Sequence, residues 1–180
     1  MIFATVGTQL PFDRLLQALE TWAARNPNVP VLAQSGACTR KFAHVQTIRH
    51  LTQTEFSATL SSARLIVAHA GMGTILSASE LGKPVILMPR RAKFNEHRND
   101  HQLDTANEMR RLSNVTVVDD GEALHQALDL AVSLGFESGQ ASLSSIGQEL
   151  DPLIEEVRKF VWTGAAYSPA GSMLDTTSAA

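Results

Sequence analysis

The stretch His69-Ala70-Gly71-Met72-Gly73-Thr74 decides the expected fold of this chain. It follows the apolar run 63–68 and precedes residues 75–81, which can form a helix, so it predicts a turn between a buried strand and a helix N-terminus. The free N–H groups and the dipole of such a terminus attract phosphate. Glycines let a ligand approach the backbone, and Thr74 can cap the helix or donate a hydroxyl hydrogen bond. A simple strand–helix connection would explain the same glycines, because short glycine motifs are common.

The residues that follow place this turn in an open parallel sheet. Gly82-Lys83-Pro84 is predicted to end the helix, because glycine suits the position after a helix and proline cannot continue it. Residues 85–89 are typical of a short buried strand. The polar loop 90–102 comes next, and residues 103–112 are predicted to be helical. The turn and the loop thus lie at the carboxyl ends of two successive strands, where open α/β sheets bind ligands.

These motifs together resemble a known family. The run from the glycine turn through Pro89 to Asp100-His101-Gln102 is similar to the nucleotide-sugar-binding half of GT-B glycosyltransferases, of the family 28 C-terminal type. The likeness is greatest to the Alg13-like group, which includes the exopolysaccharide subunits of the PssE type. The opening residues 3–8 and Pro11-Phe12-Asp13 also resemble that group, so the resemblance extends from residue 1 to about residue 130.

Composition excludes several classes of protein. Of the 180 residues, 44% are hydrophobic and 18% are charged, which suits one globular domain with a sizeable core. The net charge of −3 gives no general attraction to nucleic acid, and no such partner is expected. Cys38 is the only cysteine, which excludes an intrachain disulfide and a cysteine-based zinc site. No signal peptide or membrane span is recognisable, so we expect a cytoplasmic protein that is at most peripherally attached to a membrane.

Strand and helix patterns alternate along the chain. Alternation of this kind implies a parallel α/β sheet with helices on both faces. The resemblance implies that this is a Rossmann-like domain equivalent to the donor-binding half of a GT-B enzyme. We place this nucleotide-sugar-binding domain at 1–134, a linker at 135–147, an amphipathic helix at 148–162 and a disordered tail at 163–180. Strands are expected at 2–6, 29–35, 45–51, 63–68, 85–89 and 115–118, and helices at 12–25, 54–62 (capped by Thr54), 75–81, 103–112 and 122–134.

The first group of predicted site residues would hold the diphosphate of a nucleotide sugar. Its backbone N–H groups and hydroxyls would stabilise the leaving diphosphate as charge develops on it. His69 could donate to the phosphates or act as a catalytic base, although a lone histidine is more often structural. An ordinary tight turn explains Gly7 and Thr8 equally well. The full group is Gly7, Thr8, His69, Gly71, Met72, Gly73 and Thr74.

Ribose and sugar contacts are assigned to two further groups. Related enzymes hold the ribose with an acidic helix residue, but here Ser77 stands at that place and Glu80 follows one turn later, so either could serve. Glu80 suits a solvated helix surface equally well. Asp100 and Gln102 match the Asp/Gln pair that holds sugar hydroxyls, since a carboxylate accepts and an amide both donates and accepts. They would also suit the first turn of the next helix. The weaker sugar-binding candidates beside them are Glu96, His97, Arg98 and His101.

A basic cluster lies in the same loop. Such a cluster can be a solvated surface or can meet an anion, and a guanidinium can bind a carboxylate through two hydrogen bonds. This favours a uronic acid donor, UDP-glucuronate, over UDP-N-acetylglucosamine. No Asp-x-Asp pair and no H-E-x-x-H pattern occurs, so we expect no metal and no cofactor besides the UDP-sugar substrate. The cluster comprises Arg90, Arg91, Lys93 and Arg98.

The length of the chain bears on its partner. GT-B enzymes need two Rossmann-like halves, and 180 residues suffice for only the donor half. The resemblance therefore implies a membrane-associated, Alg14-like (PssD-type) subunit that supplies the acceptor site and the general base, which leaves the catalytic residue unknown. The helix 148–162 could dock on this partner or pack on its own domain.

The expected activity is inverting transfer of a UDP-sugar to a polyprenyl-diphosphate-linked glycan in exopolysaccharide biosynthesis, at the inner face of the cytoplasmic membrane. The acceptor and the inversion are implied by the resemblance alone. The alternatives are a nucleotide-sugar-binding regulatory module without turnover, a UDP-GlcNAc transferase, and a nucleotide-sugar epimerase or hydrolase.

Overall fold

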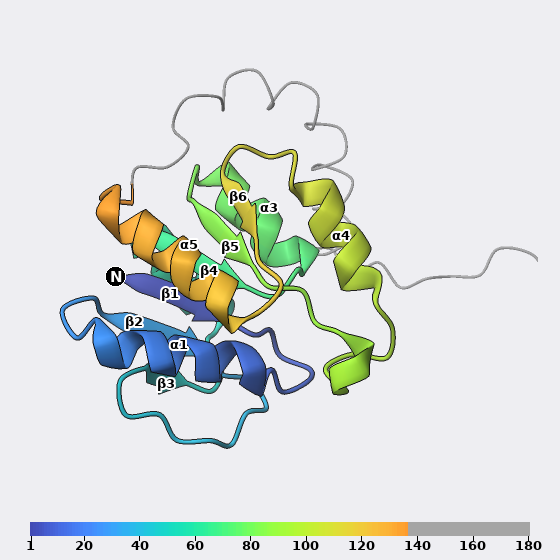
Figure 1. Cartoon of the computed structure of the whole chain (residues 1–180), viewed down its shortest axis with the longest axis horizontal. Coiled ribbons are helices and arrows are strands. Elements are labelled where there is room, and N and C mark those ends of the chain that lie inside the picture. Colours follow the sequence, from blue (N-terminus) through green and yellow to red (C-terminus); the bar gives the residue numbers. More distant parts are fainter. Residues whose placement is uncertain (137–180) are drawn as a thin grey trace, which may run out of the picture. The chain divides into compact units, whose positions relative to one another are not determined.

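The computed structural model describes residues 1–136, which belong to one compact unit, Met1–Ser145 (Figure 1). The predicted helix 148–162, the tail 163–180 and most of the linker 135–147 lie outside the described residues. The strands are β1 (Ile2–Thr5), β2 (Val31–Gln34), β3 (Gln46–Ile48), β4 (Leu65–Ala68), β5 (Val85–Leu87) and β6 (Val115–Val117). The helices are α1 (Asp13–Arg25), α2 (Gln53–Ser62), α3 (Met72–Glu80), the short 3₁₀ helix η1 (Ala92–Phe94), α4 (His101–Met109) and α5 (Gly121–Ser133).

The strands form a parallel sheet in the order β3-β2-β1-β4-β5-β6. This is the strand order of the doubly wound Rossmann fold, so the predicted fold class is confirmed. The order reverses between β1 and β4, and ligands of such sheets bind outside the carboxyl ends of the strands at that point. The last residues of β1, β4 and β5 (Thr5, Ala68 and Leu87) lie side by side in register. The segments after these three strands therefore leave the sheet at one edge.

Helices cover both faces of the sheet. On one face α1 and α5 pack over alternate strand residues such as Ile2 and Val67 (Figure 1). The intervening residues Phe3 and Ile66 are equally buried, and the Phe3 ring meets Phe56 of α2 with 5.6 Å between centroids. Burial on both faces explains why these strands are apolar throughout rather than alternating. No helix within residues 1–136 has the length and apolar character needed to cross a membrane.

The end of α3 follows the sequence prediction. Gly82 has φ +61°, in the left-handed region that glycine adopts freely. The N–H groups of Gly82 and Lys83 donate to the carbonyls of Ser79 and Ala78 at 3.0 and 2.9 Å. These two bonds make a Schellman motif, which satisfies the last carbonyls of the helix. The helix stop predicted at Gly82 is confirmed.

Two predicted caps are wrong. Helix α2 begins at Gln53 and is capped by Thr52 rather than Thr54, because Thr52 and Glu55 form a reciprocal capping box. Thr74 does not cap α3 either, since that helix begins at Met72. In both cases the helix starts earlier than its apolar pattern suggests. The Thr52–Glu55 capping box starts α2, whereas α3 starts at Met72 without a side-chain cap.

Candidate functional site

The glycine turn lies at the carboxyl end of β4, beside the point where the strand order reverses. Its N-cap residue Gly71 donates its N–H to the carbonyl of His69 at 2.8 Å and provides no side-chain cap. Within residues 1–136, no acceptor meets the N–H groups of Met72, Gly73 and Thr74. The first turn of α3 also carries no acidic residue. The turn therefore offers three amide donors and the positive end of a helix dipole to an anion.

The ring of His69 packs against two glycines. A Cβ at Gly71 would stand 2.3 Å from His69 Nε2, and one at Gly7 would stand 2.9 Å from His69 Cε1. The ring nitrogen Nδ1 lies 3.5 Å from the carbonyl oxygen of Thr5, to which it can only donate. Burial and the charge of Arg90 lower the pKa of His69 to about 4. At neutral pH the ring is therefore uncharged, with the lone pair of Nε2 as an acceptor.

This state of His69 differs from the expected phosphate donor. A neutral imidazole whose Nδ1 already donates has no second N–H to offer, so it acts as a proton acceptor. Donation to a phosphate would require a second proton, which an anion beside the ring would favour. The lowered pKa argues against the donor role, and a ring with a pKa of about 4 is also a weak base at neutral pH, so the base role of His69 stays a prediction.

The segment after β1 meets the same edge. Gly7 has φ +75°, a conformation that favours glycine, and its N–H donates to Thr5 Oγ1 at 3.3 Å. Thr8 is exposed, and neither its N–H nor its hydroxyl has a partner in the described part of the chain. Of the two diphosphate-binding residues predicted in this segment, Thr8 keeps donors for a ligand, while Gly7 makes the turn and leaves room for the His69 ring.

The loop after β5 is held by three of the predicted sugar-binding side chains. The successive N–H groups of residues 90, 91 and 92 donate to Gln102 Oε1, Glu96 Oε2 and Asp100 Oδ1 at 3.1, 3.0 and 2.8 Å. The buried carboxylate of Glu96 also accepts from Arg14 Nε and Nη2 at 2.8 and 2.9 Å. Both of its oxygens thus already have partners, so Glu96 anchors the loop, and its role as a sugar ligand stays a prediction.

Asp100 and Gln102 keep atoms that a ligand can use. Helix α4 begins at His101, two residues before the predicted start, and Asp100 occupies the N-cap position without making a capping hydrogen bond. Asp100 is exposed, and within residues 1–136 neither its Oδ2 nor Gln102 Nε2 has a partner. One carboxylate oxygen and one amide nitrogen therefore remain, an acceptor and a donor suited to sugar hydroxyls.

The two flanking histidines lie against each other. The rings of His97 and His101 meet edge to face with 4.4 Å between centroids, and His101 Nδ1 bonds to Asn99 Oδ1. Burial, with the charges of His101 and Arg90, lowers the pKa of His97. The charge of His97 in turn acts on the pKa of His69. The glycine turn and the loop after β5 also follow neighbouring parallel strands, so both lie at the same edge of the sheet.

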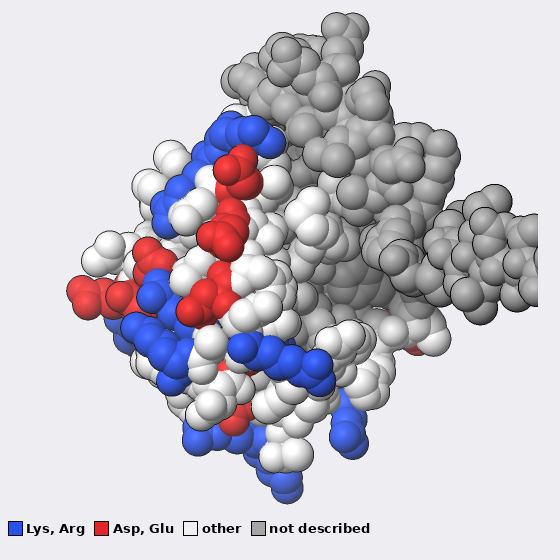
Figure 2. All heavy atoms as spheres, turned by 90° about the vertical axis from the view of Figure 1, so that its right-hand side faces the viewer, with Lys and Arg blue, Asp and Glu red and all other residues white. Residues whose placement is uncertain are grey.

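The basic cluster is mostly engaged within the chain. Arg90 is buried, Arg91 pairs with Asp119 at 2.6 Å, and Lys93 lies over the Phe94 ring. Arg98 is exposed and has no hydrogen-bond or ion-pair partner in the described residues. Figure 2 shows the face that carries this loop and α4, where basic and acidic side chains are interspersed. Of the four cations, Arg98 is the guanidinium left for an anionic ligand.

The ribose candidates lie on α3, behind the glycine turn. Ser77 is half-buried and its hydroxyl has no partner in residues 1–136, whereas Glu80 is exposed and ends the helix. Glu80 is about 4.5 Å farther along the helix axis than Ser77, at 1.5 Å per residue. The ribose assignment stays a prediction, with Ser77 nearer to the turn.

Arg14 is a site residue that sequence reasoning missed. It lies on α1 and binds Glu96, which is 82 residues away in the sequence. No local pattern indicates such a pair, because periodicity and spacing report only on neighbours within one element.

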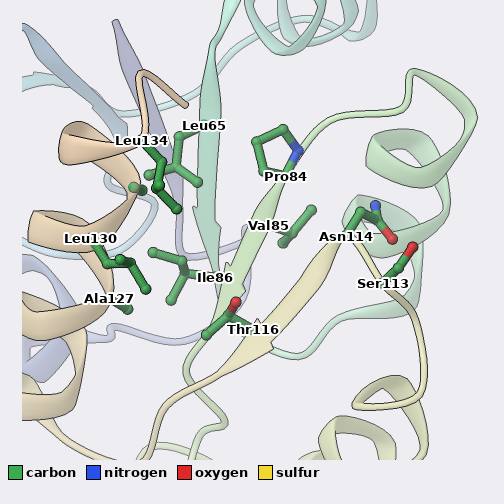
Figure 3. A pocket seen from close by; sticks show the side chains of 11 residues that line it. Leu65, Pro84, Val85, Ile86, Ser113, Asn114, Thr116, Ala127, Leu130 and Leu134 are labelled. Atoms are coloured by element: carbon green, nitrogen blue, oxygen red, sulfur yellow. The ribbon is translucent and has the colours of Figure 1, made fainter. Parts of the chain in front are cut away.

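A small pocket at the opposite edge of the sheet is a different feature (Figure 3). Its lining is mainly apolar and comes from the amino ends of β4, β5 and β6 and from α5; it includes Leu65, Val85, Thr116, Leu130 and Leu134. No predicted site residue lines it, so it is not the candidate site. Among residues 1–136, no three His, Cys, Asp or Glu side chains are placed to hold a metal ion, and metal independence stays a prediction.

The fold and the open turn define a Rossmann-like domain with a ligand edge at the carboxyl ends of β1, β4 and β5. Residues 1–142 match the family model described as the glycosyltransferase family 28 C-terminal domain. The chain therefore belongs to this glycosyltransferase family.

Solved structures show the same fold. The NMR solution structure of ALG13 has a TM-score of 0.58 and 17% identity, over 85% of this chain and 94% of that one. The glycosyltransferase of kitacinnamycin has a TM-score of 0.56 and 20% identity, over 87% of this chain and 39% of that one. The UDP-GlcNAc 2-epimerase from Neisseria meningitidis, bound to UDP-GlcNAc, has a TM-score of 0.57 and 12% identity, over 88% of this chain and 44% of that one. This chain thus spans less than half of the last two proteins. No curated protein sequence matches it significantly.

Proposed function

We propose that this chain is the donor-binding subunit of an inverting glycosyltransferase that uses a UDP-sugar. The observation that carries the proposal is the N-terminus of α3, whose three amide donors have no acceptor within residues 1–136. Such a terminus suits a diphosphate, whose charge grows as it leaves the sugar. Membership of a glycosyltransferase family supports a nucleotide sugar as the source of that diphosphate.

The sugar would lie against the loop after β5. Asp100 Oδ2 and Gln102 Nε2 would hold its hydroxyls, with His97 and His101 beside them. Arg98 has no partner within residues 1–136, which supports a sugar that carries a carboxylate, because a guanidinium binds a carboxylate through two charge-assisted bonds. We therefore favour UDP-glucuronate over UDP-N-acetylglucosamine as the donor.

The acceptor half would come from a second polypeptide. We infer an Alg14-like (PssD-type), membrane-associated subunit that supplies the acceptor site and the general base and holds this chain at the cytoplasmic face of the membrane. The likeness to nearly the whole length of ALG13 supports a subunit of this kind. The acceptor would be a polyprenyl-diphosphate-linked glycan of exopolysaccharide biosynthesis. His69, with its neutral ring, is the alternative to a base on the partner.

Calorimetric titration tests the donor role. The chain would be titrated with UDP, UDP-glucuronate, UDP-N-acetylglucosamine and UDP-glucose, with and without the candidate partner. Binding of one UDP-sugar, strengthened by the partner, is expected and would name the donor. No binding in either state would refute the proposal.

Two isosteric variants test the sugar site in the reconstituted complex. Asp100→Asn and Gln102→Glu keep the oxygens that accept from Ala92 and Arg90 but alter the atoms left for a ligand. Both are expected to abolish transfer, whereas Asp104→Asn, at an exposed position of α4, should not. Full activity in both site variants would show that the sugar binds elsewhere.

The wild-type protein distinguishes the alternative functions. Binding of a UDP-sugar without transfer in the complex would favour the regulatory module. Release of UDP by the chain alone would favour an epimerase or hydrolase.

A further inference from the structure

A buried guanidinium joins two segments of the ligand edge. Arg90 follows β5 and is 3% exposed. Its Nη1 donates to the carbonyls of Pro11 and Glu96 at 2.7 and 3.0 Å, and its Nη2 donates to those of Val6 and Leu10, both at 2.6 Å. Three of these carbonyls belong to the segment after β1 and one to the loop after β5. All four Nη–H groups are thus used to tie one segment to the other.

A second guanidinium, from Arg14 on α1, ties the same loop from outside. Its Nε and Nη2 bind the Glu96 carboxylate at 2.8 and 2.9 Å. Nη2 also donates to the carbonyl of Pro89 at 2.9 Å, and Nη1 to that of Asp119, after β6, at 3.0 Å. Arg14 therefore connects the start of α1 with the segments that follow β5 and β6.

The Phe12 ring joins the two guanidinium groups. It is fully buried, with its centroid 4.7 Å from Arg90 Cζ and 5.2 Å from Arg14 Cζ. Both cations can therefore interact with the ring as well as with their hydrogen-bond acceptors. We call Arg90, Phe12 and Arg14 the arginine clamp.

The charge of Arg90 is felt inside the site. Burial lowers the pKa of Arg90 to about 10 while Glu96 opposes the shift, so the group remains charged at neutral pH. The Arg90 guanidinium donates to backbone carbonyls, which carry no charge, and its own charge lowers the pKa of His69. A buried cation is costly, and apolar residues of similar volume often stabilise a fold better. Its four carbonyl acceptors, which come from two segments, indicate a role in geometry rather than in general stability.

We propose that Arg90 is a positioning residue of the donor site, and that the arginine clamp sets the placement of the segment after β1 relative to the loop after β5. The inference rests on the proposed function, because one donor molecule would touch both segments, its diphosphate near Thr8 and its sugar at Asp100 and Gln102. The backbone N–H of Arg90 also holds Gln102 Oε1 at 3.1 Å, which extends the clamp to the sugar side. Segments held in place before binding need no ordering by the ligand.

The substitution Arg90→Lys tests the clamp. Lysine keeps the charge, but its three N–H groups diverge from one atom and cannot serve four carbonyls arranged around a planar fork. The dissociation constants of UDP, UDP-glucuronate and UDP-N-acetylglucosamine would be measured by calorimetry on the full chain. We expect the affinity for the preferred UDP-sugar to fall by about tenfold or more, and the affinity for UDP to fall less. A merely structural role would lower stability and leave the ratio of the two constants unchanged.

Arg64→Lys is the matched control. Arg64 also donates to a backbone carbonyl, that of Gly135, and its Cζ lies 4.7 Å from the centroid of the Phe136 ring. It precedes β4 at the opposite edge of the sheet, so the same substitution there should leave both dissociation constants as in the wild type. If circular dichroism shows that Arg90→Lys does not fold, Arg14→Lys takes its place, with a smaller change of the ratio in the same direction.

The outcomes separate the two proposals. A wild type that prefers a UDP-sugar to UDP, with a folded clamp variant that keeps the wild-type ratio, would overturn the clamp and leave the donor role intact. A wild type that binds neither UDP nor a UDP-sugar would remove the proposed function, and the positioning role with it.

Discussion

The turn after β4 and the loop after β5 leave the sheet at the same edge but are built in opposite ways. In the turn, the N–H groups of residues 72–74 meet no acceptor within residues 1–136. In the loop, the N–H groups of residues 90–92 all donate to side chains of the loop and of α4. The turn is open to a ligand, and the loop is closed on itself.

The difference follows from what each segment is proposed to bind. A diphosphate needs many donors in one place, and the first turn of a helix supplies them from the backbone at fixed positions. A sugar is recognised by a few polar atoms whose positions matter more than their number. A long polar loop can hold such atoms in place only if its own backbone is satisfied first.

The largest effect is expected from removing the anchor of the loop. Glu96→Ala should lower the free energy of unfolding by about 3 kcal/mol, because it leaves the Arg14 guanidinium without its carboxylate in a largely buried place. Urea denaturation measures the loss. The control Glu108→Ala breaks an exposed pair with Arg111 and should cost about 0.5 kcal/mol or less. Equal, small losses for both would mean that the loop does not depend on this carboxylate.

A pH series probes the turn through His69. The pKa of this ring is about 4 in the folded chain against 6.5 as its ordinary value, so the unfolded chain binds more protons between these values. The neutral His69 ring therefore contributes fully to the free energy of unfolding above pH 6.5. This contribution is lost as the pH falls toward 4, and the loss is up to about 3 kcal/mol.

His69→Gln should remove that part of the pH dependence. The lowered pKa of His97 acts in the same direction and persists in the variant, so the comparison isolates His69. Unfolding free energies would be measured for both proteins from pH 7 to pH 4. Parallel curves would show that the ring titrates normally and is not enclosed as described.

Two glycine substitutions distinguish space for His69 from helix propensity. Gly71→Ala should destabilise by about 1–3 kcal/mol, because its Cβ would stand 2.3 Å from Nε2 of His69. Gly73→Ala meets nothing within 4 Å and should stabilise α3 by up to about 1 kcal/mol. Thermal unfolding measures whether each variant is less or more stable than the wild type. The NMR chemical shift of the His69 ring reports its displacement in Gly71→Ala. The same sign for both variants would contradict the packing of His69 described above.

The smallest effect on the fold is expected at Arg98. Arg98→Gln should change the free energy of unfolding by less than about 0.5 kcal/mol, since this exposed side chain has no partner in the described residues. If the donor is a uronate, binding of UDP-glucuronate should weaken by about tenfold while binding of UDP-N-acetylglucosamine stays unchanged. An equal change for both donors would remove the argument for a carboxylate on the sugar.

Sequence reasoning predicted the strands and turns that form the site but not the hydrogen bonds between them. The strand before the turn, the stop at Gly82 and the parallel sheet follow from local apolar runs and backbone preferences, which are written in neighbouring residues. Asp100 and Gln102 were predicted as ligands, and the structure shows that an oxygen of each also builds the loop. Glu96 is a weaker ligand candidate from sequence, and its pairing with Arg14 across 82 residues is a contact that sequence reasoning did not predict.

The sequence by itself determined the α/β class, the position of the glycine turn and the edge of the sheet to which it belongs, because strand and helix periods and glycine conformation are local properties. Only the tertiary structure decided which polar atoms remain for a ligand. It brought Gly7 and Gly71 against the His69 ring and placed Arg90 against four carbonyls. A donor or acceptor is free only if no distant segment reaches it, and that depends on packing between residues that are far apart in the sequence.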